Sequence, residues 1–372
     1  MSIDKSIDFL LENGSHIIKY RLHKEILHDI NKNEEENLLE KVFDSPKFKL
    51  VEGYQKENGY IGIGMHSGDK FKETALQDGE VAARLLSNYG IPKDSLIIKR
   101  FIDALTNDEV LEHEFSYHRP EITRFKERYL GNEAGWGLQL LIDTVIALLG
   151  YGDRYCQRMI NISLAAFTSI ESRTSIMDIA TFKQNAKRKY NYPYLEIGQQ
   201  WPCMYHLETL SHTSLWRNEA SKKQLAEAIN HLIEITPEKN PYYIKLGNRY
   251  YAPCGGFSMP IKPYGDWRKQ LVCNRRVLTD ITRCGIGEMV TVTKQTAETL
   301  QEELHKNDGL RVKFESNYEK SKFKLSLMYP GPYCELGLAD DYKSDHAITC
   351  DLTFWAIHFL HEYNYFKSCK IT

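Results

Sequence analysis

A helical hairpin recurs along this chain, and it constrains the fold more than any other sequence feature. In each copy an apolar segment ends at a short turn, and a polar residue opens the next helical segment. The copies cover residues 85–105, 146–167, 210–232 and 278–300. Asp94, Asp153 and Asn218 stand where a side chain would cap the second helix. One hairpin cannot bury its own apolar face, so such hairpins stack or close into a ring.

The helical segments differ in their apolar patterns. Residues 136–149 and 350–361 are apolar on almost every side, which is typical of buried helices, and 203–212 belongs with them. Residues 221–235 are apolar on one face only, which is typical of an outer helix. Inner and outer helices in alternation predict an all-α fold, an α/α toroid built as a double-layered ring of hairpins.

Nothing in the sequence marks a domain boundary, so we expect residues 1–372 to form a single domain. Within it, residues 1–50 are expected to be a helical segment that packs on the ring. The stretches 239–267 and 307–345 are rich in aromatic residues, proline and glycine, and we expect long irregular loops there.

Composition excludes several functional classes. The formal net charge of −2 gives no electrostatic case for binding nucleic acid or an anionic membrane. There is no apolar run of about 18 residues, so we expect no membrane span. The start of the chain lacks the features of an export signal, and the eight cysteines form no CxxC pair. These features predict a cytoplasmic protein with reduced thiols.

Three segments resemble a known superfamily. The sequence VEGYQKENGYIGI at 51–63 is similar to a degenerate Q-x-x-x-G-aromatic turn of squalene-cyclase-type repeats, with Gln55, Gly59 and Tyr60. Residues 201–217 and 350–361 look like segments of bacterial proteins labelled prenyltransferase-like. Those proteins belong with the terpenoid cyclase and protein prenyltransferase α/α toroids.

The resemblance implies a central aromatic-lined cavity that binds or acts on an isoprenoid or another apolar or amphipathic small molecule. The acid motif D-x-D-D and the metal-diphosphate motif D-x-x-D-D/E are both absent, so no complete catalytic motif is present. Related toroid enzymes use zinc, for which Cys203, His206 and Cys350 are weak candidate ligands. Because no complete zinc or magnesium ligand set occurs, we expect no resident metal or cofactor.

Acidic and histidine side chains near the last apolar helix are the candidate catalytic groups. Asp351 leads an almost wholly apolar helix, and Asp345 and His346 lie just before it. Desolvation and neighbouring carboxylates raise a carboxyl pKa, so Asp351 is our first choice for a general acid. His206 is a second acid–base candidate. Asp143, within another apolar helix, must be paired or protonated.

Aromatic side chains supply the candidate binding surface. We expect Trp201, Tyr205 and Trp355 to face one shared cavity together with His206 and Asp351. The further candidates for binding a ligand are Trp136, His66 and Tyr60.

Two other functions remain open at this point. One is a polysaccharide lyase or glycosidase on an α/α barrel, and the other is a non-catalytic ligand- or peptide-binding scaffold. A polar centre with two carboxylates about 5–9 Å apart would favour the glycosidase. A dry aromatic cavity with one buried acid would favour isoprenoid binding, and a filled centre with an exposed groove would favour the scaffold.

Overall fold

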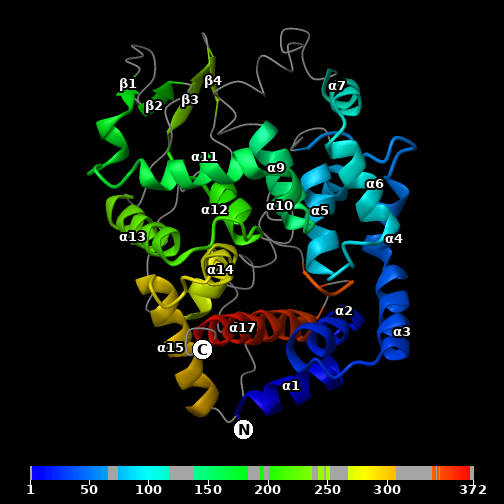
Figure 1. The fold of residues 1–372 in the computed structure, drawn as a ribbon. Coiled ribbons are helices and arrows are strands. Elements are labelled where there is room, and N and C mark those ends of the chain that lie inside the picture. Colours follow the sequence, from blue (N-terminus) through cyan, green and yellow to red (C-terminus); the bar gives the residue numbers. More distant parts are fainter. Residues whose placement is uncertain are drawn as a thin grey trace.

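The computed structural model describes residues 2–65, 74–116, 138–182, 193–196, 201–236, 242–246, 249–251, 267–306, 337–340, 342 and 344–368. These residues are predominantly helical, as the hairpin pattern predicts (Figure 1). Trp136 and His66 lie outside the described residues. In the described part of the chain, no helix has both the length and the apolar character needed to cross a membrane.

Each hairpin expected from the sequence corresponds to successive helices. The pairs are α5 (Gly79–Asn88) with α6 (Leu96–Leu105), α9 (Leu138–Leu148) with α10 (Gly152–Tyr155) and α11 (Gln157–Thr168), α12 (Met204–Ser211) with α13 (Glu219–Ile235), and α14 (Trp267–Arg283) with α15 (Thr291–Lys306). The other helices are α1 (Ser2–Asn13), α2 (His16–Arg21), α3 (Lys32–Phe43), α4 (Pro46–Gly53), α7 (Asp108–Ser116) and α17 (Asp345–Ser368). The π-helix η1 (Leu22–Leu27) directly continues α2, and short 3-10 turns lie at η3 (Ala75–Gln77) and η6 (Ile176–Asp178).

Glycines end the first helix of three hairpins. Gly90, Gly150 and Gly285 have φ values of 67°, 85° and 73°, in the left-handed region that glycine adopts without steric cost. Of the predicted caps, only Asn218 caps its own helix, by accepting from the Ser221 N–H at 2.9 Å.

The other two predicted caps are wrong. Ser95, and not Asp94, occupies the position before α6. Asp153 lies inside the first turn of α10 and accepts from the Ser214 N–H at 2.7 Å and the Leu215 N–H at 3.2 Å. It therefore holds the turn between α12 and α13, a connection that belongs to the next hairpin.

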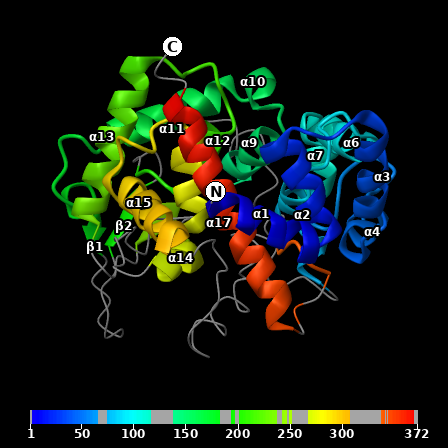
Figure 2. The same ribbon diagram turned by 90° about the horizontal axis from the view of Figure 1, so that it is seen from below.

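Contacts between helices follow the order of the chain. From α1 to α5 each helix packs against the next, and the series continues through α9, α12, α14 and α17. The last helix, α17, packs against α1 as well as α14 (Figures 1 and 2). Helix α12 and the middle of α17 are buried on every side, whereas α3 and α13 keep an exposed face.

A small β-sheet departs from the all-α expectation. Its strands are β1 (Thr181–Phe182), β2 (Pro193–Glu196), β3 (Tyr243–Leu246) and β4 (Arg249–Tyr251), in the order β1-β2-β3-β4. Strands β2 and β3 are parallel, and the outer pairings are antiparallel. The prediction of an irregular loop over 239–267 is therefore wrong at β3 and β4, which pair with each other as antiparallel strands.

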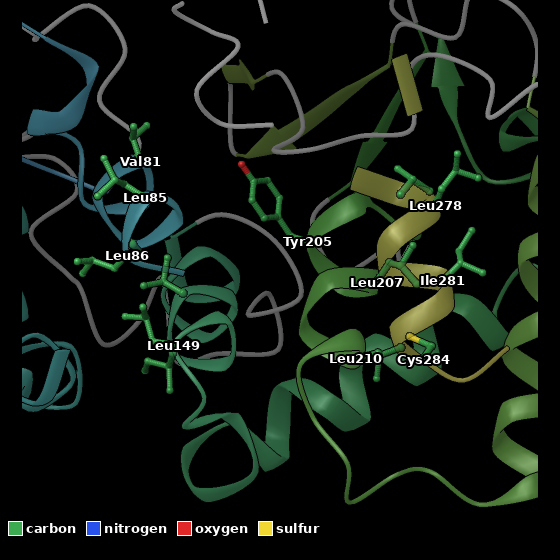
Figure 3. Close-up of a cluster of buried hydrophobic side chains, with 14 of the residues drawn as sticks. Val81, Leu85, Leu86, Leu149, Tyr205, Leu207, Leu210, Leu278, Ile281 and Cys284 are labelled. Carbon is green, nitrogen blue, oxygen red and sulfur yellow. The ribbon is translucent and has the colours of Figure 1, made fainter. Parts of the chain in front are cut away.

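Apolar side chains pack between the buried helices into one core. Figure 3 shows Tyr205 lying between apolar side chains of α5 and those of α12 and α14. Tyr60, from the turn that follows α4, is fully buried, and its ring packs edge-on against Phe101 and Phe115. This places Tyr60 in the packing of α6 and α7.

Asp143 is a carboxyl group buried within α9. Its Oδ1 accepts a hydrogen bond from the Gln139 side chain at 2.9 Å, and burial raises its pKa to about 7. The folded pKa therefore lies above the unfolded value, so the protonated acid is favoured by folding. The fold loses this stabilisation as the pH rises toward 7 and above.

We predict that Asp143→Asn stabilises the protein at pH 8 by about 1–3 kcal/mol and changes little at about pH 4, near the pKa of an unfolded aspartate. Asparagine keeps the oxygen that accepts from Gln139 and removes the charge. Urea denaturation of both proteins at the two pH values measures the effect. If Asp143→Asn destabilised the protein equally at both pH values, the ionised carboxylate would have a partner and its burial would cost no free energy.

Candidate functional site

Charged and polar side chains meet between the buried helices in a continuous set of hydrogen bonds and short polar contacts. We call this set the central network. Its members are Arg21, Glu25, Glu80, Arg84, Tyr205, Glu208, Ser211, His212, Arg276, Asp280, Arg283, His358 and Glu362. They come from α2 with η1, α5, α12, α14 and α17. Each of these segments supplies two members four residues apart, which places both on one helix face.

Glu208 is the most heavily bonded member of the central network. Arg84 donates to its two carboxylate oxygens at 2.6 and 2.7 Å. Arg276 makes a further ion pair with it, and Arg84 also pairs with Glu80 at 2.8 Å. Tyr205 donates its hydroxyl to Glu80 at 2.8 Å, and its ring lies beside both guanidinium groups. One carboxylate thereby links α5, α12 and α14.

The network continues toward the ends of α12 and α14. Ser211 donates to Asp280 Oδ1 at 2.8 Å. Arg283 lies 3.3 Å from His212 Nε2 and donates from Nε to Glu362 Oε1 at 3.0 Å. We call His212, Asp280, Arg283, His358 and Glu362 the carboxyl-end cluster. The first three lie near the carboxyl ends of α12 and α14, and Glu362 and His358, from within α17, join them through the bond between Glu362 and Arg283.

The π-helix brings the first helices of the chain into the same network. Arg21 and Glu25 form a two-bond ion pair, with distances of 2.8 and 2.7 Å. His358 Nε2 lies 3.0 Å from Glu25 Oε2. The π-helix ends at His28, whose φ of 52° is the one left-handed non-glycine value within the described ranges. Short π-helical segments often mark functional sites.

The pairings show that the contributing helices run parallel. Glu80 pairs with Tyr205 near the start of both helices, and Arg84 pairs with Glu208 one turn further on in each. The side chains of Arg84 and Glu208 are 4% and 3% exposed. Arg283, at the end of α14, is 25% exposed. The network therefore approaches solvent where these helices end.

Two neighbouring carboxyl groups have pKa values shifted in opposite directions. Burial opposes ionisation of Glu208, but Arg276 and Arg84 outweigh it and hold its pKa well below the usual range. Burial, and then the charge of Glu208, raise the pKa of Asp280 to about 7. Their oxygens lie within 4.8 Å of each other. Near neutral pH this pair therefore consists of an ionised carboxylate beside a protonated acid.

Glu208, His212 and Asp280 also have the spacing of a metal site, since one ligand atom of each lies within 4.8 Å of the others. Glu208 is nevertheless already committed, because both of its oxygens accept from guanidinium groups. Burial and Arg283 lower the pKa of His212 to about 3, so its ring is neutral. A cation at this position would displace those contacts and lie next to the guanidinium groups. The donor set suits proton chemistry better than a metal ion.

Some residues predicted from the sequence lie in or beside the central network. Tyr205 is a member, and Trp355, 5% exposed, lies 5.7 Å from the Arg21 guanidinium. His206 is buried, but its Nδ1 accepts a hydrogen bond from the Cys203 N–H at 3.1 Å, so its side chain helps to cap the start of α12. Burial raises the pKa of the Cys203 thiol to about 11.

Asp351 is fully buried at the edge of this region, in α17. It accepts from the Leu338 N–H at 3.1 Å and from the Tyr342 hydroxyl. Burial, against these hydrogen bonds, raises its pKa to about 6, which agrees with the expectation of a buried acid. Asp345 and His346 are instead exposed at the start of α17, where His346 meets Phe9.

The remaining candidates lie apart from the network. Trp201 is 4% exposed just before α12, and its Nε1 has no hydrogen-bond partner among the described residues. Cys350 is directed toward the end of α1, where its Sγ lies 3.5 Å from the Asn13 carbonyl. In the described ranges, Cys203, His206 and Cys350 do not gather into a metal-binding group.

Most members of the central network were missed by the sequence analysis. Arg84, Glu208, Asp280 and Glu362 are charged residues within helices that are otherwise largely buried. Charged pairs four residues apart within such helices were a usable signal.

Comparison of the chain with protein-family models, curated proteins and solved structures finds no match in any of the three.

We predict that Glu208→Gln destabilises the protein by about 3–5 kcal/mol, because it leaves two buried guanidinium groups without their shared carboxylate. Glu227→Gln is the control, because Glu227 forms an exposed pair with Lys223 at 3.8 Å. That variant should change stability by less than about 1 kcal/mol. Chemical denaturation measures the free energy of unfolding of both variants. Equally small changes in the two would contradict the conclusion that the Glu208 ion pairs hold the central helices together.

Proposed function

We propose that the hairpins of this chain form a closed, double-layered ring, an α/α toroid that comprises residues 1–372 as one domain. The support is the order of helix contacts, which follows the chain and returns from α17 to α1. The helices that carry the central network are the inner layer in this proposal, and α3, α13 and α15 belong to the outer layer.

We further propose that the chain is an acid–base enzyme acting on a carbohydrate, in the class of α/α-barrel glycosidases and polysaccharide lyases. The observation that carries this is the pair of Asp280 and Glu208, a raised-pKa acid beside an ionised carboxylate. Such a pair divides the roles of proton donor and charge stabiliser, as in glycoside cleavage. Asp280 is the general acid. Glu208, held by arginines, stabilises positive charge that develops on the substrate.

We predict that Asp280→Asn lowers turnover by about 10²–10⁴-fold, because it removes the proton donor. In the wild-type enzyme, activity should fall as the pH rises above about 7, where Asp280 loses its proton. A panel of chromogenic glycosides and uronate-containing oligosaccharides provides the assay. Asp143→Asn is the matched control, since it alters another buried acid with a raised pKa. Full turnover by Asp280→Asn, or no cleavage of any substrate by the wild type, would contradict the proposal.

The isoprenoid chemistry implied by the sequence resemblance is a second candidate. Asp351 favours it, because it is a buried acid with a pKa of about 6 and Trp355 lies one turn along the same helix. An acid of this kind protonates an alkene, and an aromatic face stabilises the resulting cation. The charged character of the central network favours the carbohydrate proposal over this one.

If the isoprenoid candidate is right, the protein binds farnesol, and Trp355→Leu weakens that binding by about tenfold or more. Phe359→Leu is the control, because Phe359 is also buried in α17. Fluorescence titration measures the affinity. Equal loss in both variants would indicate a general packing defect, and no binding of farnesol would remove this candidate. A protein that neither cleaves glycosides nor binds farnesol would fit the scaffold alternative.

A further inference from the structure

Three buried polar atoms of the carboxyl-end cluster have no hydrogen-bond partner within the described part of the chain. They are Asp280 Oδ2, Glu362 Oε2 and His358 Nδ1. Asp280 and His358 are 2% and 3% exposed. Buried polar atoms in folded proteins are nearly always paired, and an exception calls for an explanation such as a bound water or ion. The three atoms belong to one connected group, because Arg283 joins Glu362 to His212, and His212 lies beside Asp280.

The two ring nitrogens of His358 differ in their surroundings. Its Nε2 lies 3.0 Å from Glu25 Oε2 and 3.2 Å from Arg21 Nη2, so it can donate to the carboxylate or accept from the guanidinium. Its Nδ1 accepts in the first case and donates in the second, and it has no partner among the described residues. The missing partner of His358 is thus a group that can meet either role.

The charges of the central network are already balanced. Arg21, Arg84, Arg276 and Arg283 form ion pairs with Glu25, Glu80, Glu208 and Glu362. The two bordering arginines also have carboxylates nearby, since Arg275 acts on Asp351 and Arg217 on Asp153. An anionic ligand would find no cation in the central network that is not already paired with a carboxylate. A cationic ligand would lie next to guanidinium groups, which carry the same charge.

One buried donor lies at the same end of α12. Arg217 donates from Nη2 to the Ser211 carbonyl at 2.6 Å, while its Nε has no partner among the described residues. The unsatisfied atoms therefore include acceptors and a donor. A hydroxyl group both donates and accepts without carrying charge, so it suits this mixture better than an ammonium or a carboxylate.

We propose that the carboxyl-end cluster binds the hydroxyl groups of an uncharged, polyhydroxylated ligand, a neutral sugar or polyol. The ligand enters at the carboxyl ends of the buried helices, where Arg283 is 25% and Glu362 18% exposed. This inference rests on the proposed carbohydrate function and names its substrate class. It selects hydrolysis of neutral glycosides over elimination, because elimination by a lyase requires the carboxylate of a uronate.

Calorimetric titration with matched sugars tests the inference without requiring turnover. The probes are glucose, galactose and mannose, each beside its uronate and its amino sugar. We expect at least one neutral sugar to bind about tenfold or more tightly than both of its charged counterparts. Binding of no neutral sugar, or equal or tighter binding of the charged forms, would overturn the inference.

Two variants locate the binding site. His358→Gln keeps a polar side chain toward Glu25 and removes the Nδ1 atom, and Glu362→Gln replaces the carboxylate by an amide. Both should weaken neutral-sugar binding by about tenfold or more, whereas Asp143→Asn should not. Unchanged affinity in a variant that keeps its thermal midpoint would overturn the assignment. If neutral sugars bind but are not cleaved, only the proposed enzymatic activity is contradicted. If cleavage is confined to uronate substrates, only the inference of a neutral ligand is contradicted.

Discussion

The ion pairs of Glu208 with Arg84 and Arg276 are the interaction on which the centre of this protein depends. They connect α5, α12 and α14 through one carboxylate. Charges removed from water cost free energy that their attraction only partly returns, so such pairs add little net stability compared with apolar residues. Their geometry nevertheless permits one register between the helices. A sliding of α12 by one turn would separate the buried Glu208 carboxylate from both guanidinium groups.

That arrangement also sets the chemistry of the neighbouring acids. Glu208 stays ionised because arginines surround it, and its negative charge adds to burial in keeping Asp280 protonated. Asp143 and Asp351 reach raised pKa values by burial against only partial hydrogen bonding. Asp280 differs from them because an ionised carboxylate lies beside it. This neighbour makes Asp280 the best placed of the three to donate a proton while charge develops nearby.

The backbone dipoles of the central helices suit the charges at two of the helix ends. Aligned peptide dipoles place partial negative charge at helix carboxyl ends, where cations are favoured. Arg283 is the last residue of α14, whereas Glu80 lies in the first turn of α5. Backbone and side chains therefore complement each other at these two positions. The carboxyl-end cluster also holds the unsatisfied polar atoms from which we infer a neutral, hydroxyl-bearing ligand.

Local patterns in the sequence were sufficient for the helical hairpins. The apolar segments predicted at 136–149, 203–212 and 350–361 correspond to α9, α12 and part of α17, because burial on every side requires an apolar surface all round. The small sheet was missed, since its strands are very short and the pairing of β2 with β3 joins segments that are far apart in the sequence. A single buried acid such as Asp351 or Asp143 was also recognisable, because a carboxyl group within an all-round apolar helix is buried together with its neighbours.

The central network was decided only by the tertiary structure. Glu80 and Arg84 have the same spacing in the sequence as Lys223 and Glu227, yet the first pair is buried and the second is exposed. Sequence spacing determines which side chains share a helix face, and it does not determine what that face meets. Glu208, which pairs with Arg84, and Glu362, which pairs with Arg283, come from helices more than 70 residues away along the chain. Packing alone brought those charges together, and with them the acid pair and its unsatisfied neighbours.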